Sequence, residues 1–119
     1  MSITSKSTIN NCHESRLGRS VRTGRCGSDP RMVPEFIRSH TLLTNNLDRA
    51  EQRQTQLEII SVLFETVADT LLAQCWRNWC LHCCAMPLHT LRCLSSGVEE
   101  CAETEKLEEE MTALKNYFL

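Results

Sequence analysis

Residues 57–72 read LEIISVLFETVADTLL, and this stretch carries the clearest helical pattern of the chain. Its apolar side chains recur at intervals of three and four residues, which is the repeat of one face of an α-helix. Further apolar residues flank this row, so the stripe is wider than one neighbouring helix would cover. We therefore expect it to bind a protein partner or a second copy of the chain, through Leu57, Ile60, Phe64, Val67, Asp69 and Leu71.

The helix around this stretch is predicted to be long. No glycine or proline occurs between Glu35 and Met86, and Asn45 with Asp48 marks a helix start. A helix over 46–85 alone would measure about 60 Å at about 1.5 Å per residue, which is longer than so small a domain is wide. We expect a long helix within residues 34–94, with a cysteine-rich end, that pairs with another helix or breaks at Pro87.

A second helix is predicted at the C-terminus, over residues 95–119. Ser96 followed by Glu99 resembles a capping box, in which each side chain accepts a hydrogen bond from the backbone of the other. Apolar positions recur through this segment while its other faces are rich in glutamate. The predicted fold class is all-α, with a helical hairpin or a coiled coil formed by the two helices.

Residues 1–33 are predicted to form a disordered basic arm, because they show almost no apolar periodicity. In an extended chain, Arg16, Arg19, Arg22 and Arg25 would point the same way about 9 Å apart. Such a row suits phosphates or an acidic protein surface. A solvated tail without a partner is the favoured interpretation, while nucleic-acid contact and targeting to an organelle or the nucleus stay open.

Five of the eight cysteines lie within residues 75–93, CWRNWCLHCCAMPLHTLRC. Zinc requires four ligands in a tetrahedron, and two pairs with a spacing of four could supply them: Cys80 with Cys84, and His89 with Cys93. The alternative, which we favour, is that these cysteines pack as small apolar side chains. Disulfide or redox chemistry is a third option. The sequence implies no cofactor other than this zinc ion.

Two short resemblances fall on the central stretch. Residues 60–71, with Ala68 and Asp69 between apolar positions, resemble the BH3 helix that docks into the groove of Bcl-2-type proteins. That resemblance implies that Asp69 would pair with an arginine of the partner. Residues 57–72 are also similar to a segment of the Brick subunit of the Scar/WAVE complex, which implies a coiled-coil subunit.

The function expected from these patterns is protein binding without catalysis. No nucleophile, base and orienting group can be assembled from the motifs, so we expect no enzyme. The longest apolar stretch contains Glu58, Glu65 and Asp69, which argues against a membrane span. We expect an intracellular adaptor or complex subunit, cytoplasmic or nuclear. The alternative is a zinc-binding, cysteine-rich regulator of the viral accessory type whose basic arm contacts nucleic acid.

Overall fold

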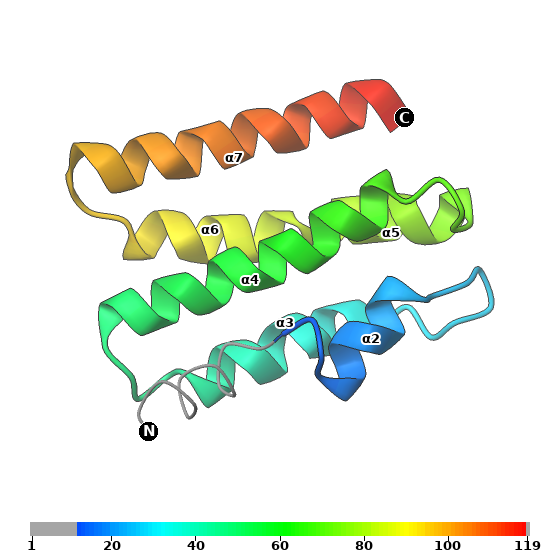
Figure 1. Cartoon of the computed structure of the whole chain (residues 1–119), viewed down its shortest axis with the longest axis horizontal. Helices are drawn as coiled ribbons and strands as arrows, with labels where there is room; N and C mark the ends of the chain where they lie inside the picture. Colours follow the sequence, from blue (N-terminus) through cyan, green and yellow to red (C-terminus); the bar gives the residue numbers. More distant parts are fainter. Residues whose placement is uncertain (1–11, 119) are drawn as a thin grey trace.

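The computed structural model describes residues 12–118, except for the side chain of Phe118. Within this range the chain forms helices and no strand, which confirms the all-α class (Figure 1). The helices are α2 (Arg16–Arg22), α3 (Met32–Leu43), α4 (Arg49–Ala68), α5 (Gln74–Cys83), α6 (Ala85–Leu94) and α7 (Gly97–Phe118).

Helix α4 lies at the centre of the molecule, and it contacts all the other described helices. Its start is set by Asp48, whose side chain accepts a hydrogen bond from the Glu51 backbone N–H at 2.9 Å. Figure 1 shows α2 and α3 on one side of α4 and the remaining helices on the other. Apolar side chains from several faces of α4 are therefore buried, among them Ile59, Ile60, Val62, Leu63, Phe64 and Val67.

The predicted continuous helix within residues 34–94 is wrong, because the chain reverses after α4. The Asp69 side chain accepts the Leu71 N–H at 3.0 Å and closes a turn. Arg77 of α5 donates from Nε to the Val67 carbonyl at 2.8 Å, which satisfies one of the carbonyls that a helix end leaves open. A second turn, over residues 44–48, separates α3 from α4.

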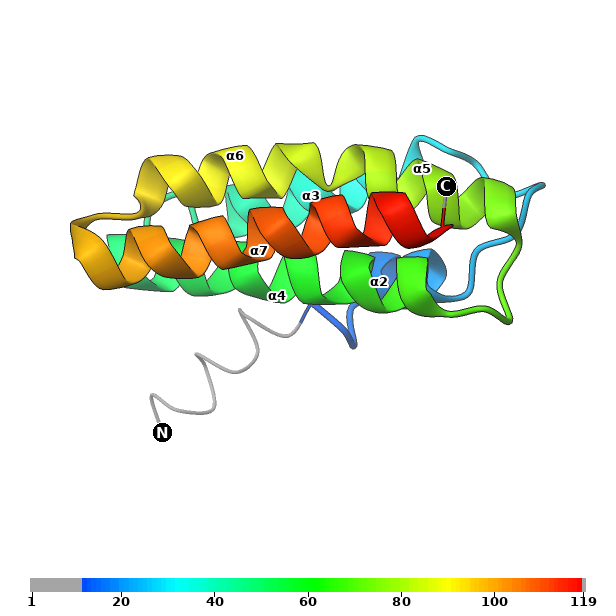
Figure 2. The same ribbon diagram turned by 90° about the horizontal axis from the view of Figure 1, so that it is seen from above.

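Helices α5 and α6 follow one line antiparallel to α4, with a single interruption at Cys84 (Figures 1 and 2). Pro87 lies in the first turn of α6, where a missing N–H is tolerated. The break that we expected at Pro87 thus occurs three residues earlier, and it does not reverse the chain.

Helix α7 lies over the seam between α4 and the line formed by α5 and α6 (Figure 2). It begins at Gly97, whose φ of +76° is a left-handed conformation that glycine adopts without strain. The Ser96 N–H donates to Glu100 at 2.8 Å, so Glu100 plays the part that we expected of Glu99. The inner face of α7 packs through Leu107, Met111 and Leu114, and the described residues form a bundle where we expected a hairpin or coiled coil.

The boundary of the predicted disordered arm at residue 33 is corrected, because residues 12–33 pack against the bundle; residues 1–11 lie outside the described range. Ser15 caps α2 by accepting the Gly18 N–H at 2.9 Å. Val21 is fully buried, and its carbonyl accepts the indole N–H of Trp76 at 2.8 Å. The sequence hid this packing because the few apolar side chains that the segment buries, such as Cys12, Val21 and Val33, are far apart and follow no helical repeat.

A substitution at Gly24 tests whether the N-terminal segment packs on Trp76. A Cβ at position 24 would lie 2.0 Å from Cε2 of the Trp76 ring, so Gly24→Ala forces the indole or the backbone to move. We expect a loss of about 1–3 kcal/mol in the free energy of unfolding, measured by urea denaturation. Gly27→Ala is the matched control, because nothing lies within 4 Å of its Cβ. Equal stability of the two variants would contradict this packing.

Candidate functional site

The predicted partner-binding stripe is mostly core. Ile60 and Val67 are buried and Phe64 is only 8% exposed, while Leu57 is partly buried against the same cluster. In this fold these four side chains contact the chain's own helices. They are therefore not presented to the groove of a partner, as the BH3 resemblance would require.

Asp69 and Leu71 are placed differently from the rest of the stripe. Both lie in the loop after α4, and the Leu71 side chain is 94% exposed. Asp69 accepts a hydrogen bond from Arg22 Nη1 at 3.1 Å. The arginine that pairs with Asp69 is thus within this chain, whereas the BH3 resemblance placed it on the partner.

A groove of about 500 Å³ runs between residues 22–25 and residues 69–73; we name it the disulfide-end groove. Two sets of residues that the sequence assigned to separate sites meet in it: Arg22 and Arg25 from the basic row, and Asp69 and Leu71 from the stripe. Its complete lining is Arg22, Thr23, Gly24, Arg25, Asp69, Leu71, Leu72 and Ala73.

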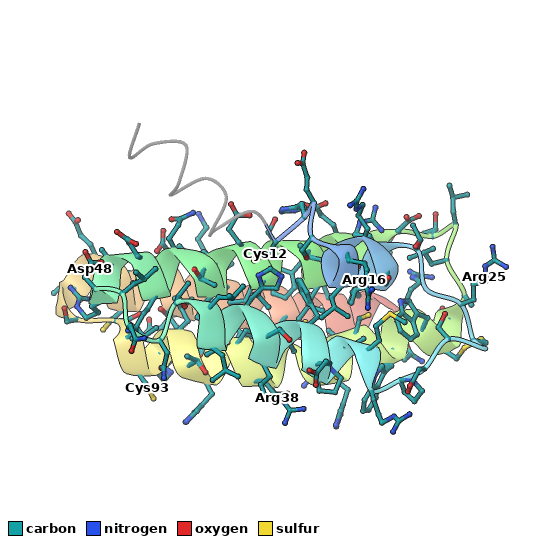
Figure 3. All side chains as sticks on the ribbon, turned by 90° about the horizontal axis from the view of Figure 1, so that it is seen from below. Cys12, Arg16, Arg25, Arg38, Asp48 and Cys93 are labelled. Carbon is teal, nitrogen blue, oxygen red and sulfur yellow. A yellow bond between two sulfur atoms is a disulfide. The ribbon has the colours of Figure 1, made fainter. Side chains whose placement is uncertain are left out.

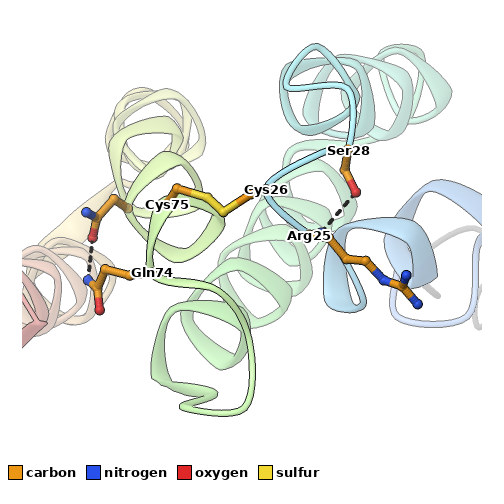
Figure 4. Close-up of a disulfide and its surroundings, with 6 residues drawn as sticks. Arg25, Cys26, Ser28, Gln74 and Cys75 are labelled. Atoms are coloured by element: carbon orange, nitrogen blue, oxygen red, sulfur yellow. Dashed lines mark hydrogen bonds between the residues drawn. A yellow bond between two sulfur atoms is a disulfide. The ribbon is translucent and has the colours of Figure 1, made fainter.

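A disulfide between Cys26 and Cys75 ties the two walls of the groove together (Figure 4). The two Cα atoms are 5.9 Å apart, and both cysteines are exposed. The backbone N–H of Arg25, next to the bridge, donates to Ser28 Oγ at 2.9 Å. A covalent link therefore joins the two walls of the groove, and a polar link orders the loop beside it.

The groove also has a defined charge. The Leu71 N–H, and after it Arg22, hold the pKa of Asp69 below its ordinary value, so Asp69 is ionised at neutral pH. Arg22 is occupied by this carboxylate and lies 3.9 Å from Glu65. The Arg25 side chain points outward from the end of the molecule (Figure 3). Arg25 therefore supplies the accessible positive charge at the rim.

The four arginines do not form the predicted extended row. Arg16 and Arg19 lie exposed on α2, Arg22 turns toward Asp69, and Arg25 follows in the loop. The row is interrupted because Arg22 is bound to Asp69 and Arg25 lies beyond the end of α2. The four side chains therefore do not form a single row that could follow a phosphate backbone.

The four candidate zinc ligands are not brought together. Cys80 and Cys84 are buried in the core, whereas His89 and Cys93 are exposed on α6. Among residues 12–118 no group of three or more His, Cys, Asp or Glu is placed to hold a metal ion. The zinc site that the sequence offered as an alternative, with Cys80, Cys84, His89 and Cys93 as ligands, is therefore not formed in this structure, because one pair is buried and the other is exposed.

The buried cysteines behave as packed thiols. Burial raises the pKa of Cys12 to about 12, of Cys80 to about 12 and of Cys83 to about 11, and it raises the pKa of Cys84 as well. Burial that disfavours the thiolate this strongly makes these cysteines poor nucleophiles. These cysteines therefore fill space in the core.

The sequence did not reveal the Cys26–Cys75 pair or the contact between Trp76 and Val21. One signal was present: Cys26 lies between Gly24 and Gly27 in a polar stretch, where a cysteine has no apolar face to join. The identity of its partner depends on where α5 places Cys75. That placement is a consequence of the reversal after α4.

Comparisons of this chain with protein-family models, with curated proteins and with solved structures found no match. The resemblances to the BH3 helix and to the Brick subunit therefore rest on the residues quoted for them.

The ion pair at the groove predicts a pH dependence of stability. Because the folded-state pKa of Asp69 is lowered, the contribution of its carboxylate is complete above the unfolded-state pKa of about 3.9. That contribution is lost as the pH falls through the folded-state pKa. We expect the stability difference between the wild type and Asp69→Asn to be largest at neutral pH and to vanish in acid, by urea denaturation across pH.

The Arg22→Met variant and the double variant Arg22→Met with Asp69→Asn complete a cycle for this pair. The losses in the free energy of unfolding caused by the two substitutions should be less than additive at neutral pH and additive in acid. A difference between wild type and Asp69→Asn that is independent of pH would contradict the assignment.

The disulfide predicts a separate stability effect. Its cysteines are 49 residues apart, so Cys26→Ser should lower the free energy of unfolding by about 2–4 kcal/mol under oxidising conditions. Cys101→Ser, which removes an exposed free thiol, is the control and should change it by less than about 0.5 kcal/mol. When a reductant is added, Cys26→Ser and the wild type should have the same free energy of unfolding.

Proposed function

We propose that this chain is a non-enzymatic helical protein that binds a protein partner, and that the disulfide-end groove receives it. The observation that supports this is the 94% exposure of Leu71 beside a groove with a basic rim. Apolar anchors surrounded by polar groups are typical of protein-binding surfaces.

Leu71 is exposed although its backbone is fixed. Its N–H donates to the Asp69 side chain, and the Leu72 N–H donates to the Asp69 carbonyl at 3.1 Å. Asp69 is in turn bound by Arg22 of the opposite wall. A partner therefore meets a backbone that is already ordered, so less backbone entropy is lost on binding.

The chemistry of the groove defines the partner. An apolar side chain of the partner would pack on Leu71 and Leu72, and a carboxylate would pair with Arg25 at the rim. Since Arg22 is already paired with Asp69, a single nearby acid is sufficient. We infer that the partner offers a short segment with an apolar residue close to Asp or Glu.

Other exposed apolar residues fit this role less well. Leu42 and Leu43 lie at the end of α3, and Val98 is 87% exposed at the start of α7. Neither position lies in the groove that places the exposed Leu71 in one lining with Arg25. The groove is for that reason the surface that we assign to the partner.

A role as an intracellular complex subunit, cytoplasmic or nuclear, belongs to the same proposal. The helices of residues 12–118 include none that is long and apolar enough to cross a membrane. Disulfides are rare in reducing compartments, so Cys26 and Cys75 would be thiols there. Trp76 and Arg22 would then hold the two walls of the groove.

The proposal can be tested by selecting a displayed peptide library against the full chain in the presence of a chelator. We expect enrichment of peptides in which Asp or Glu lies near a large apolar residue. Leu71→Asp and Arg25→Glu should each weaken their binding at least about tenfold, which is about 1.4 kcal/mol, measured by calorimetry.

Val98→Asp is the matched control, because it places the same charge on an exposed apolar residue at the other end of the bundle. It should bind the peptides like the wild type. Peptides that bind Leu71→Asp and the wild type equally would contradict the proposed surface.

A further inference from the structure

His89 and Cys93 form an exposed pair on α6 that the disulfide-end groove does not include. They are one helical turn apart, and Nε2 of His89 lies 3.8 Å from Sγ of Cys93. Both residues are exposed. Figure 3 shows Cys93 pointing away from the bundle, at the end opposite to Arg25.

The separation of these two atoms suits a metal. Zinc binds cysteine sulfur at about 2.3 Å and histidine nitrogen at about 2.0–2.1 Å, so two such ligands in a tetrahedron are about 3.6 Å apart. The pair is already close to that value within one helix. Little rearrangement is needed for both atoms to bind one ion.

Cys93 differs from the other free cysteines in its surroundings. Cys12, Cys80, Cys83 and Cys84 are buried, which leaves Cys93 and Cys101 as the exposed free thiols. Of these two, Cys93 has an imidazole nitrogen beside its sulfur. The pair thus combines accessibility with two ligand types that zinc prefers.

One chain supplies only half of a tetrahedral site. Among the described residues no third His, Cys, Asp or Glu joins the pair at metal-binding distance. Two copies related by a twofold axis place the same surface against itself, so the second copy brings one more histidine and one more cysteine. We propose that His89 and Cys93 of two copies together bind one zinc-type divalent ion in a Cys2His2 site.

The surface around the pair is compatible with close approach of a second copy. Ala85 and Met86, which is 46% exposed, lie one turn before His89 on α6. A small residue and a flexible apolar one allow two helices to approach. The neighbouring Arg92 is paired with Glu108, with its Nε 3.0 Å from Oε2, so its charge is neutralised.

Cobalt(II) is the probe for the test, because its visible absorption reports tetrahedral sulfur and nitrogen ligands. The full chain is titrated with cobalt(II) in oxygen-free buffer, with absorption and sedimentation velocity followed together. We expect the visible absorption bands of tetrahedral cobalt(II) to saturate at one ion per two chains. The monomer should be converted to a dimer over the same range of cobalt concentrations. Zinc should displace the cobalt and keep the dimer.

His89→Ala and Cys93→Ser should each abolish both the bands and the metal-dependent dimer. The matched controls are Cys101→Ser and His82→Ala, which remove another exposed thiol and another exposed imidazole and should behave as the wild type. Circular dichroism checks that each variant keeps its helices.

Three results would overturn the proposal. These are a dimer that persists in a chelator, cobalt bound at one ion per monomer without a dimer, and bands that survive in Cys93→Ser. Leu71 and Arg25 take no part in this metal site. A negative result in the cobalt titration therefore leaves the peptide-binding proposal intact, and a negative result in the peptide selection leaves the metal-site proposal intact.

Discussion

The docking of Trp76 on residues 21–24 is the contact on which the rest of the structure depends. Its indole N–H is satisfied by the Val21 carbonyl, and its ring occupies the space that a side chain at position 24 would need. A buried indole without an acceptor would be costly. This contact therefore ties α5 to the N-terminal segment, and both of these also contact α4.

Three further links join the same two parts of the chain. Arg22 reaches Asp69, Trp79 donates from its indole to the Pro30 carbonyl at 2.6 Å, and Cys26 lies close enough to bond to Cys75. Each of these contacts joins residues more than forty positions apart. Together they build the two walls of the groove, so the candidate binding surface is a consequence of how the N-terminal segment docks.

The cysteines show how one residue type acquires different chemistry from its position. Burial raises the pKa of the thiols that face the core and leaves them inert. Cys26 and Cys75 meet at the surface and form a covalent link. Cys93 stands exposed beside an imidazole. Sequence spacing alone groups Cys80, Cys84 and Cys93, whereas the fold buries the first two and leaves Cys93 exposed.

The sequence by itself determined the helical class, a helix that carries the apolar stripe and an acidic helix after Ser96, whereas the start expected at Asn45 lies three residues later, at Asp48. These features depend on side chains within one or two turns, so local periodicity and capping reveal them. Only the tertiary structure decided that the chain reverses after Ala68, that the stripe becomes core, and that Arg22 and Leu71 share a groove. Periodicity shows which face of a helix is apolar, but what covers that face depends on contacts between distant segments.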